Sequence, residues 1–236
     1  MMIEEMYTSG TYLEKWPTWH TEISPWSARQ IFRMMKRNNI APKTICEVGC
    51  GAGEILKQLQ LRMNEECMFR GYEISPQAIE LCKSRANERL QFQLADFRQE
   101  KDVFFDLILI IDVIEHVEDY FSFMRDIQPK GSYKIIHIPM DLTMKSFFRG
   151  SLLELRREHG HIHYFTRDIA LAMLKDIGYD VLDYFYTTPT IDLPTNGSIP
   201  EIRRRLMKLP RKLLFAMHED VAAQTLGGCS LMVLAK

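Results

Sequence analysis

A glycine-rich turn between an apolar strand and a helix constrains this chain more than any other segment. Residues 44–48 form a short apolar run, Gly49, Gly51 and Gly53 follow, and a helical pattern covers residues 53–63. Glycines at such a turn allow positive φ and let a ligand approach the backbone, and the first N–H groups of the helix then face that ligand. The G-x-G-x-G spacing lacks the G-x-G-x-x-G fingerprint of dinucleotide sites and the Lys-Ser/Thr of a phosphate-binding loop. The turn therefore predicts a ligand site and argues against a nicotinamide dehydrogenase.

Strand and helix patterns alternate from this turn onward. The expected strands cover residues 44–48, 67–73, 90–95, 103–111, 132–138, 179–187 and 230–235, and the expected helices cover 53–63, 76–88, 118–128, 141–158 and 167–177. Alternation at this spacing predicts a parallel sheet with helices on both faces. The nearly continuous apolar run in the fourth strand is typical of a central strand buried on both sides. Ligands of such sheets bind at the carboxyl ends of the strands.

The segment before the glycine turn predicts a separate cap element over residues 1–40. Residues 1–24 have the composition of a loop with a short turn. Ser24-Pro25 then predicts a helix start, with serine as the cap and proline in the first turn, and the helix runs to about Arg37.

The rest of the chain, residues 41–236, predicts one domain with two insertions. The alternating pattern is interrupted at about 140–165 and again at about 189–226. Within the second insertion, Ser198 and Glu201 fit a capping box that starts a helix.

Acidic side chains follow three of the expected strands. Glu73 ends the second strand about twenty residues beyond the glycine turn, where a carboxylate can bind both ribose hydroxyls of an adenosine. Asp96 and Phe97 follow the third strand and place a carboxylate and an aromatic ring where an adenine edge and face would lie. Asp112 follows the fourth strand, so all three carboxylates are expected at one edge of the sheet.

These segments resemble the motifs of class I S-adenosylmethionine-dependent methyltransferases. Residues 47–53, Glu-Val-Gly-Cys-Gly-Ala-Gly, resemble the first motif of that family. Glu73, Ala-Asp-Phe at 95–97 and Asp-Val-Ile-Glu-His-Val at 112–117 resemble the next three in order and spacing. The resemblance covers roughly residues 40–188 and the last ten. It implies an α/β fold with a Rossmann-like, doubly wound, seven-stranded sheet, mostly parallel, whose last strand is antiparallel between the fifth and sixth.

The same resemblance implies S-adenosyl-L-methionine as the cofactor and assigns residues to its parts. The methionine half would be held by Glu47, Gly49 and Gly51, the ribose by Glu73, and the adenine by Ile74, Asp96 and Phe97, with Asp112 also facing the cofactor. In related folds the N-terminal element covers this cofactor, which makes Trp19 and His20 candidate walls of the pocket.

Three interpretations of Asp112, Glu115 and His116 stay open at this point. If helical, the three share one face, where they line the cofactor pocket. Alternatively, His116 is a catalytic general base toward an acceptor hydroxyl, or the set ligates a divalent metal. A carboxylate-x-x-Glu-His motif with a later histidine binds metal in small-RNA 3′-terminal methyltransferases, and ubiquinone-pathway O-methyltransferases carry similar motifs. The resemblance thus implies Glu115, His116 and His161 as metal ligands, although Asp112 stands where those enzymes more often carry glutamate.

Composition and charge restrict the partners. The net charge of −1 gives no general attraction to nucleic acid or anionic membranes. The five cysteines form no C-x-x-C pair, which is typical of reduced thiols in the cytosol. There is no signal-peptide pattern and no run of about 20 apolar residues. We therefore expect a cytoplasmic protein with a small-molecule acceptor and no nucleic-acid partner, and the oligomeric state stays open.

One basic stretch departs from this neutral balance. Residues 203–212 contain six basic side chains interleaved with apolar ones. Such a stretch within 201–217 predicts a lid that faces the acceptor, a peripheral membrane contact or a solvated helix face.

Taken together, the sequence predicts a methyltransferase that O-methylates a small molecule, such as a sugar, a quinone or a lipid-linked intermediate, by in-line transfer. An RNA 3′-end methyltransferase that uses a divalent metal is the alternative enzyme, and a non-catalytic cofactor-binding scaffold is the alternative of another class.

Overall fold

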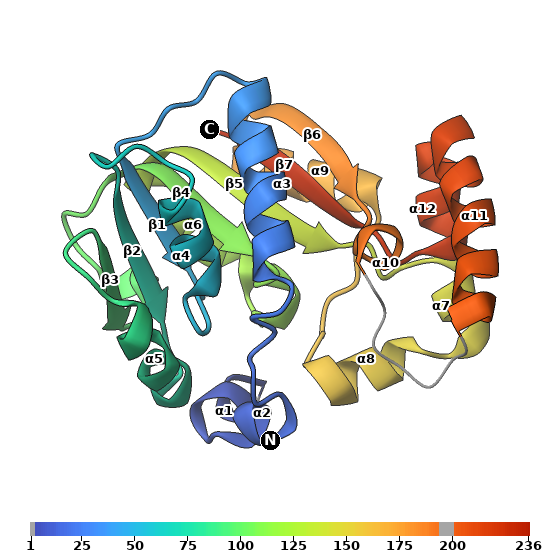
Figure 1. Cartoon of the computed structure of the whole chain (residues 1–236), viewed down its shortest axis with the longest axis horizontal. Helices are drawn as coiled ribbons and strands as arrows, with labels where there is room; N and C mark the ends of the chain where they lie inside the picture. The colour runs from blue at the N-terminus through green and yellow to red at the C-terminus, as the bar shows by residue number, and fades with distance from the viewer. Residues whose placement is uncertain (1–2, 194–200) are drawn as a thin grey trace.

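Seven strands form a single sheet in the computed structural model, which describes residues 3–193 and 201–236. The strands are β1 (Thr44–Val48), β2 (Met68–Glu73), β3 (Leu90–Leu94), β4 (Phe105–Ile111), β5 (Gly131–Pro139), β6 (Val181–Thr187) and β7 (Ser230–Ala235). Their order is β3-β2-β1-β4-β5-β7-β6, and β7 is antiparallel to both neighbours, whereas β1 to β5 pair in parallel. The predicted Rossmann-like sheet with an antiparallel last strand is confirmed (Figure 1).

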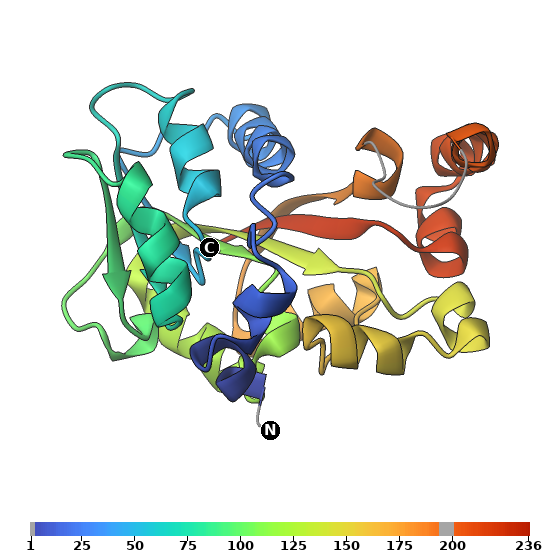
Figure 2. The same ribbon diagram turned by 60° about the horizontal axis from the view of Figure 1, so that its bottom comes forward.

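Helices cover both faces of the sheet. They are α1 (Ile3–Thr8), α2 (Thr11–Lys15), α3 (Ser24–Arg37), α4 (Glu54–Gln60), α5 (Pro76–Cys82), α6 (Tyr120–Ile127), α7 (Met144–Arg149), α8 (Leu152–His159), α9 (Arg167–Ile177), α10 (Pro189–Asp192), α11 (Glu201–Met217) and α12 (Glu219–Leu226). Buried side chains of α3 and α4 pack on one face, and those of α6 and α9 pack on the other. Figure 2 shows these layers from below, with α1 and α2 at the edge of the sheet.

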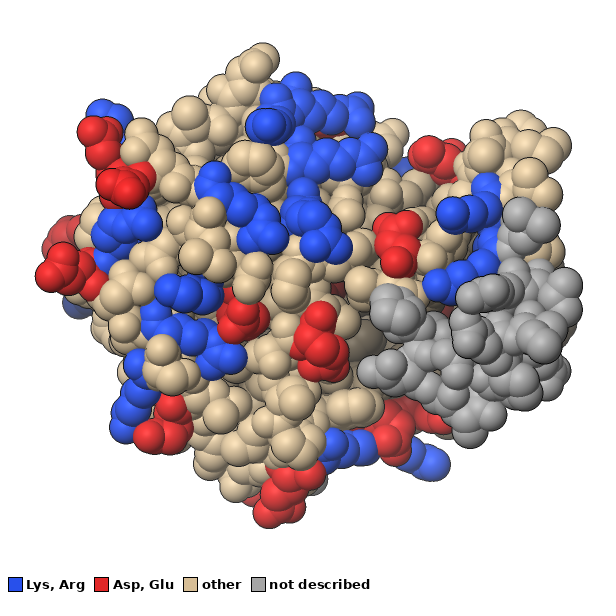
Figure 3. All heavy atoms as spheres, in the orientation of Figure 1, with Lys and Arg blue, Asp and Glu red and all other residues tan. Residues whose placement is uncertain are grey.

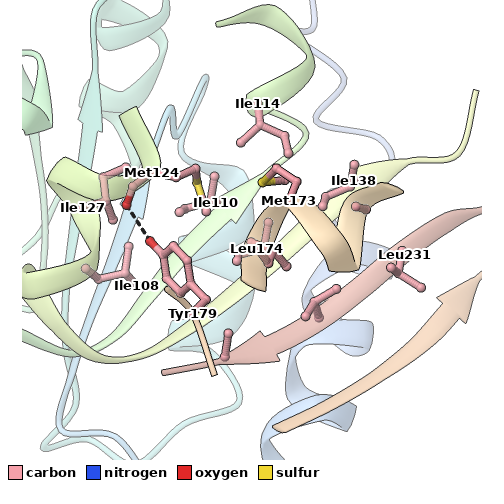
Figure 4. Packing of buried hydrophobic residues seen from close by; sticks show 14 of the residues in the cluster. Ile108, Ile110, Ile114, Met124, Ile127, Ile138, Met173, Leu174, Tyr179 and Leu231 are labelled. Atoms are coloured by element: carbon pink, nitrogen blue, oxygen red, sulfur yellow. Dashed lines mark hydrogen bonds between the residues drawn. The ribbon is translucent and has the colours of Figure 1, made fainter. Parts of the chain in front are cut away.

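The central strand β4 supplies side chains to both layers of the core. Ile108 and Ile110 lie with the α6 and α9 side chains, whereas Leu107 and Leu109 lie with those of α3 and α4. This follows from the two-residue period of a strand. Figure 4 shows the first layer, in which the Tyr179 hydroxyl donates a hydrogen bond of 2.7 Å to the Met124 carbonyl oxygen. Each fully buried side chain of this size stabilises the fold by about 1.5–3 kcal/mol.

The N-terminal segment differs from the predicted loop. Residues 3–15 form the two short helices α1 and α2. Isolated helices of this length are unstable in water. Here the tilted rings of Tyr7 and Tyr12 pack on each other, with centroids 4.8 Å apart, and against Trp19. The predicted serine cap was also wrong, because Ser24 lies inside the first turn of α3 and the cap residue is Ile23.

A helix within the first insertion also differs from the prediction. The helix expected over 141–158 is two helices, because Gly150 adopts a left-handed φ of 62° between α7 and α8. Helix α11 continues through Pro210 to Met217. The predicted cap Ser198 lies outside the described residues. Within the described ranges, the helices lack the combination of length and apolar character that crossing a bilayer requires.

Candidate functional site

A cavity of about 700 Å³ lies over the carboxyl ends of the parallel strands. Its lining includes every residue that the sequence singled out for the site, namely Glu47, Gly49, Gly51, Glu73, Ile74, Asp96, Phe97, Asp112, Glu115, His116 and His161. Residues from four strand ends and from the first insertion therefore meet in one place. This is the position at which open α/β sheets bind their ligands.

The glycine turn forms one wall of the cavity and requires its glycines. Gly51 has a φ of 53°, and a Cβ there would lie 2.6 Å from the Trp19 indole of the cap. Gly53 has a φ of 76°, and a Cβ there would lie 2.4 Å from the Phe92 ring. Side chains at either position would collide with these rings, so glycine keeps the backbone of the turn open to the cavity.

Glu73 ties this turn to the end of β2. Its Oε2 accepts a hydrogen bond from the Gly51 N–H at 2.9 Å. Its Oε1 accepts hydrogen bonds from the N–H groups of Ile74 and Ser75 at 2.8 and 2.9 Å. Burial raises the pKa of Glu73, although these three donors act to lower it. The carboxylate thus holds the turn in shape, and the predicted contact with a ribose stays a prediction.

Asp96 and Phe97 are each engaged within the protein. Arg98 forms a salt bridge with Asp96, with its Nη2 2.7 Å from Oδ2. Partial burial acts to raise the pKa of Asp96, but the Arg98 hydrogen bonds outweigh it and lower the pKa. The Phe97 ring is buried and packs on Tyr72, with ring centroids 4.9 Å apart. An adenine would therefore share Asp96 with Arg98, and the Phe97 ring belongs to the core that supports the cavity floor.

Glu47 and Glu115 are buried carboxyl groups with unused acceptors. Oε2 of Glu47 and both carboxylate oxygens of Glu115 are buried without a hydrogen-bond partner among the described residues. Burial raises the pKa of both groups well above the usual range, and the negative charge of Asp112 adds to the shift at Glu115. A buried acceptor without a partner costs free energy, so both positions favour a ligand that supplies a donor or a positive charge.

Glu115, His116 and His161 form a candidate metal site. One ligand atom from each lies within 4.8 Å of the others. It is the one group of three or more His, Cys, Asp or Glu side chains that has this geometry among the residues that the structure describes. The two histidines come from the β4 end and from the coil after α8, and their rings meet edge to face at 4.9 Å.

Hydrogen bonds at Nδ1 leave Nε2 of both histidines available. Nδ1 of His116 lies 3.2 Å from the Gly160 carbonyl oxygen, which can only accept, and 2.9 Å from the Tyr7 hydroxyl, which itself donates to the His159 carbonyl. We infer that Nδ1 of His116 carries the hydrogen. Burial lowers the pKa of His116 to about 4, so its Nε2 is a neutral lone pair.

Asp141 fixes the second histidine in the same way. Its Oδ2 lies 2.7 Å from Nδ1 of His161. A carboxylate bound to one ring nitrogen orients the other toward a metal and raises its basicity. Asp141 was not predicted, although it lies two residues beyond the end of β5, at the same edge of the sheet as Glu73 at the end of β2.

Asp112 does not share a face with Glu115 and His116, which corrects the expectation. It has a left-handed φ of 52°, and only the short turn Ile114–His116 behind it is helical. Its Oδ1 lies 2.7 Å from Nδ1 of His137 on β5. Nε2 of His137 in turn lies 2.8 Å from the Thr187 hydroxyl. Asp112 thus lines the cavity beside the metal candidates but belongs to a separate hydrogen-bond chain.

The cap closes the cavity with aromatic side chains. Trp19 and His20 line it as predicted, and Tyr7 and Tyr12 join them, which the sequence analysis missed. The cap is held to the last turn of α8, because the Trp16 ring stacks on His159 at 5.1 Å and Lys15 pairs with Glu158 at 2.6 Å. The three alternating histidines therefore do different things: His159 packs on the cap, His161 faces Glu115, and His163 lies 2.9 Å from the Val117 carbonyl.

Part of the chain is similar to known methyltransferases. Residues 41–154 match the profile of a family described as a methyltransferase domain. Over 113 residues the chain is 29% identical to norajmaline N-methyltransferase of Rauvolfia serpentina, a match that covers 42% of this chain and 38% of that one. It is also 31% identical over 113 residues to the mitochondrial ubiquinone biosynthesis O-methyltransferase of Schizosaccharomyces pombe, a match that covers 43% of this chain and 39% of that one. The matches thus span about two fifths of these curated relatives.

A solved structure agrees over most of the chain. Magnesium protoporphyrin IX methyltransferase from Synechocystis, with bound SAH, superposes with a TM-score of 0.58 at 13% identity, covering 89% of this chain and 81% of that one. The fold is therefore that of the class I methyltransferases.

Proposed function

We propose that this chain, whose residues 41–154 belong to the methyltransferase domain family, transfers the methyl group of S-adenosylmethionine to an oxygen of a small molecule. The observation that carries the proposal is that the residues assigned to the cofactor and to the metal from the family's motifs all line one cavity of about 700 Å³. Because these residues come from separate strands and from the first insertion, their convergence supports a single binding site for cofactor and acceptor. The intact glycine turn and carboxylates disfavour a scaffold with a degenerate site.

The donors and acceptors of the cavity fit the cofactor. The buried, unpaired Oε2 of Glu47 beside the glycine turn suits the ammonium of the methionine half. Glu73 lies at the end of β2, where its oxygens can exchange part of their backbone hydrogen bonds for ribose hydroxyls. Ile74 supplies an apolar surface at the adenine end. When bound, S-adenosylmethionine supplies a methyl group on a sulfonium, which an acceptor attacks in line.

The chain's own contribution to the reaction is orientation, water exclusion and removal of a proton. Holding two reactants in line contributes about 7–11 kcal/mol to lowering a barrier. The rings of Tyr12 and Trp19 on the cap cover the cavity and exclude water. The neutral Nε2 of His116 lies 3.7 Å from Oε1 of Glu115 and is oriented into the cavity to accept the acceptor's proton or to bind a metal.

The residues around His116 fit a divalent metal. A carboxylate without a partner and two imidazole nitrogens held by Tyr7, Gly160 and Asp141 are a donor set that suits Mn²⁺, Co²⁺ or Zn²⁺ better than Mg²⁺. Glu115, His116 and His161 would hold the ion, which would lower the pKa of an acceptor hydroxyl bound beside it. This supports oxygen as the acceptor atom, although one curated relative acts on nitrogen by its name.

The same donor set is the reason to test RNA 3′-end methylation as the second candidate. On the face drawn in Figure 3, Lys and Arg gather over α3, but elsewhere they are interspersed with Asp and Glu. This mixture of charges over most of the face argues against RNA binding there. Binding of single-stranded RNA that weakens steeply with salt would support this alternative.

The proposal is tested by calorimetric titration with S-adenosylmethionine and by methyl transfer from labelled cofactor to catechol-type acceptors with added Mn²⁺. We expect binding by the wild type and weaker binding by Glu47→Gln. Arg29→Gln is the matched control, because Arg29 is exposed and does not line the cavity. Failure of the wild-type protein to bind the cofactor would refute the proposal.

A further inference from the structure

Helix α7 presents two adjacent aromatic side chains to solvent. Phe147 and Phe148 are 73% and 77% exposed, and their ring centroids are 5.7 Å apart. Met144 on the same helix is also exposed. Single exposed apolar residues are common on protein surfaces, whereas neighbouring large ones mark contact sites.

The helices around α7 add further apolar side chains. Helix α12 packs against α7, and α11 packs against α12. Leu213 and Met217, four residues apart on α11, are both exposed, as is Leu153 on α8. Figures 1 and 2 show that α7, α8, α11 and α12 together form the end of the molecule opposite β3. We call these four helices the outer lobe.

Positive charges accompany the exposed rings. Lys145 and Arg149 flank Phe147 and Phe148 on α7. Arg211 on α11 is close enough that its charge acts on Lys145 and on Arg149. Burial lowers the pKa of Lys145, and the charges of Arg211 and Arg149 lower it further. Lys145, Arg149 and Arg211 take part in none of the ion pairs found among the described residues. Their mutual repulsion favours binding of an anion beside the aromatic pair.

We propose that α7 docks the protein on a bilayer containing anionic lipids, with Phe147 and Phe148 entering the boundary between headgroups and acyl chains and Lys145, Arg149 and Arg211 binding lipid phosphates. Aromatic rings are favoured at this boundary, and basic side chains add attraction to anionic lipid. The contact is peripheral. It rests on α7 and Arg211 and not on residues 203–207 and 209, whose side chains lie outside the described part.

The position of α7 relates the docking surface to the methyl-transfer cavity. A second cavity of about 290 Å³ lies in the outer lobe, lined by Lys145 and Ser146 on the α7 side and by Asp141 and His159 on the other. His159 also lines the main cavity, and Asp141 holds His161 there. A membrane-borne acceptor would therefore enter beside the transfer site. This route depends on the proposed function, whereas the docking itself does not.

Vesicle binding by the full-length protein tests the docking. We expect sedimentation with phosphatidylcholine vesicles that contain phosphatidylglycerol, weaker sedimentation with pure phosphatidylcholine, and weakening with salt. The double variant Phe147→Ser/Phe148→Ser should bind the anionic vesicles about tenfold or more weakly. Phe104→Ser is the matched control, because Phe104 is 62% exposed but lies before β4 at the opposite edge of the sheet. The control variant should bind as the wild type does.

Two further measurements decide between possible occupants. Phe148→Trp should show a blue shift of its emission on anionic vesicles, because the indole enters an apolar environment. Sedimentation velocity of the wild type and the double variant shows whether a second copy covers α7 instead. Equal vesicle binding by wild type and double variant, absence of wild-type binding, or a dimer abolished by the double variant would each overturn the proposal. Cofactor titration of the same variants is expected to be unchanged, which keeps this outcome separate from the methyltransferase activity.

Discussion

The Tyr7 hydroxyl lies 2.9 Å from Nδ1 of His116, a residue 109 positions further along the chain. The same hydroxyl donates to the His159 carbonyl, so one phenol joins the cap, the β4 end and the C-terminal end of α8. These contacts hold the His116 ring with Nε2 toward Glu115. The cap is therefore a structural part of the site as well as its cover.

Removing this phenol should slow turnover more than it weakens cofactor binding. Tyr7→Phe deletes the hydrogen bonds to Nδ1 of His116 and to the His159 carbonyl. Loss of the bond that positions His116, worth about 0.5–1.5 kcal/mol, corresponds to roughly a two- to tenfold fall in kcat. Tyr164→Phe is the control, because Tyr164 also donates one hydrogen bond to a backbone carbonyl, 2.8 Å from Leu152, but away from the cavity. Steady-state kinetics that show the same kcat for wild type and Tyr7→Phe would contradict the positioning role.

Motifs at strand ends could be predicted from the sequence because they are local. The glycine turn and the residues that follow β2, β3 and β4 each belong to one short segment, and a parallel sheet brings the ends of its strands to one edge. Their convergence on one cavity follows from the alternation of strands and helices.

Long-range pairs could not be predicted in this way. Tyr7 and His116, or Asp112 and His137, meet only because the cap folds over the sheet and because β4 and β5 are neighbours. The expected common face of Asp112 and Glu115 failed for a local reason: the backbone turns through a left-handed φ of 52° at Asp112. A strand-to-helix junction with such a φ has no signature in side-chain spacing alone.

Glu73 should be needed both for the shape of the glycine turn and for cofactor affinity. Glu73→Gln replaces one acceptor oxygen with a donor, so a backbone N–H of Gly51, or those of Ile74 and Ser75, loses its acceptor. We expect weaker S-adenosylmethionine binding by about 1.5–3 kcal/mol, as for hydrogen bonds to a charged group. Glu80→Gln on the exposed side of α5 is the control. An unchanged Kd in calorimetry would remove Glu73 from the site.

Lys134 should make stability depend on alkaline pH. Its side chain is 2% exposed, and burial lowers its pKa from 10.5 to about 8. Between these two values the unfolded chain binds more protons than the folded one, so this group's contribution makes the free energy of unfolding rise as the pH increases from about 8 to 10.5. Lys134→Met should remove that rise, whereas Lys57→Met, on the partly exposed surface of α4, should keep it. Urea denaturation at several pH values measures the difference, and parallel pH profiles for wild type and Lys134→Met would show the prediction to be wrong.

Asp141 should control metal affinity without touching the metal. Its carboxylate lies 2.7 Å from Nδ1 of His161, so Asp141→Ala leaves that ring without its orienting acceptor. Loss of such a partner typically lowers metal affinity 10–100-fold. Asp168→Ala is the control, because Asp168 lies on α9 with its side chain 67% exposed. Titration with Mn²⁺ followed by electron paramagnetic resonance measures the affinity, and methyl transfer with and without a chelator measures the need for the ion.

A protein that holds no metal by elemental analysis and turns over fully in chelator would rule out the metal and leave His116 as the general base. In that case His116→Ala should cost about 10²–10⁴-fold in rate.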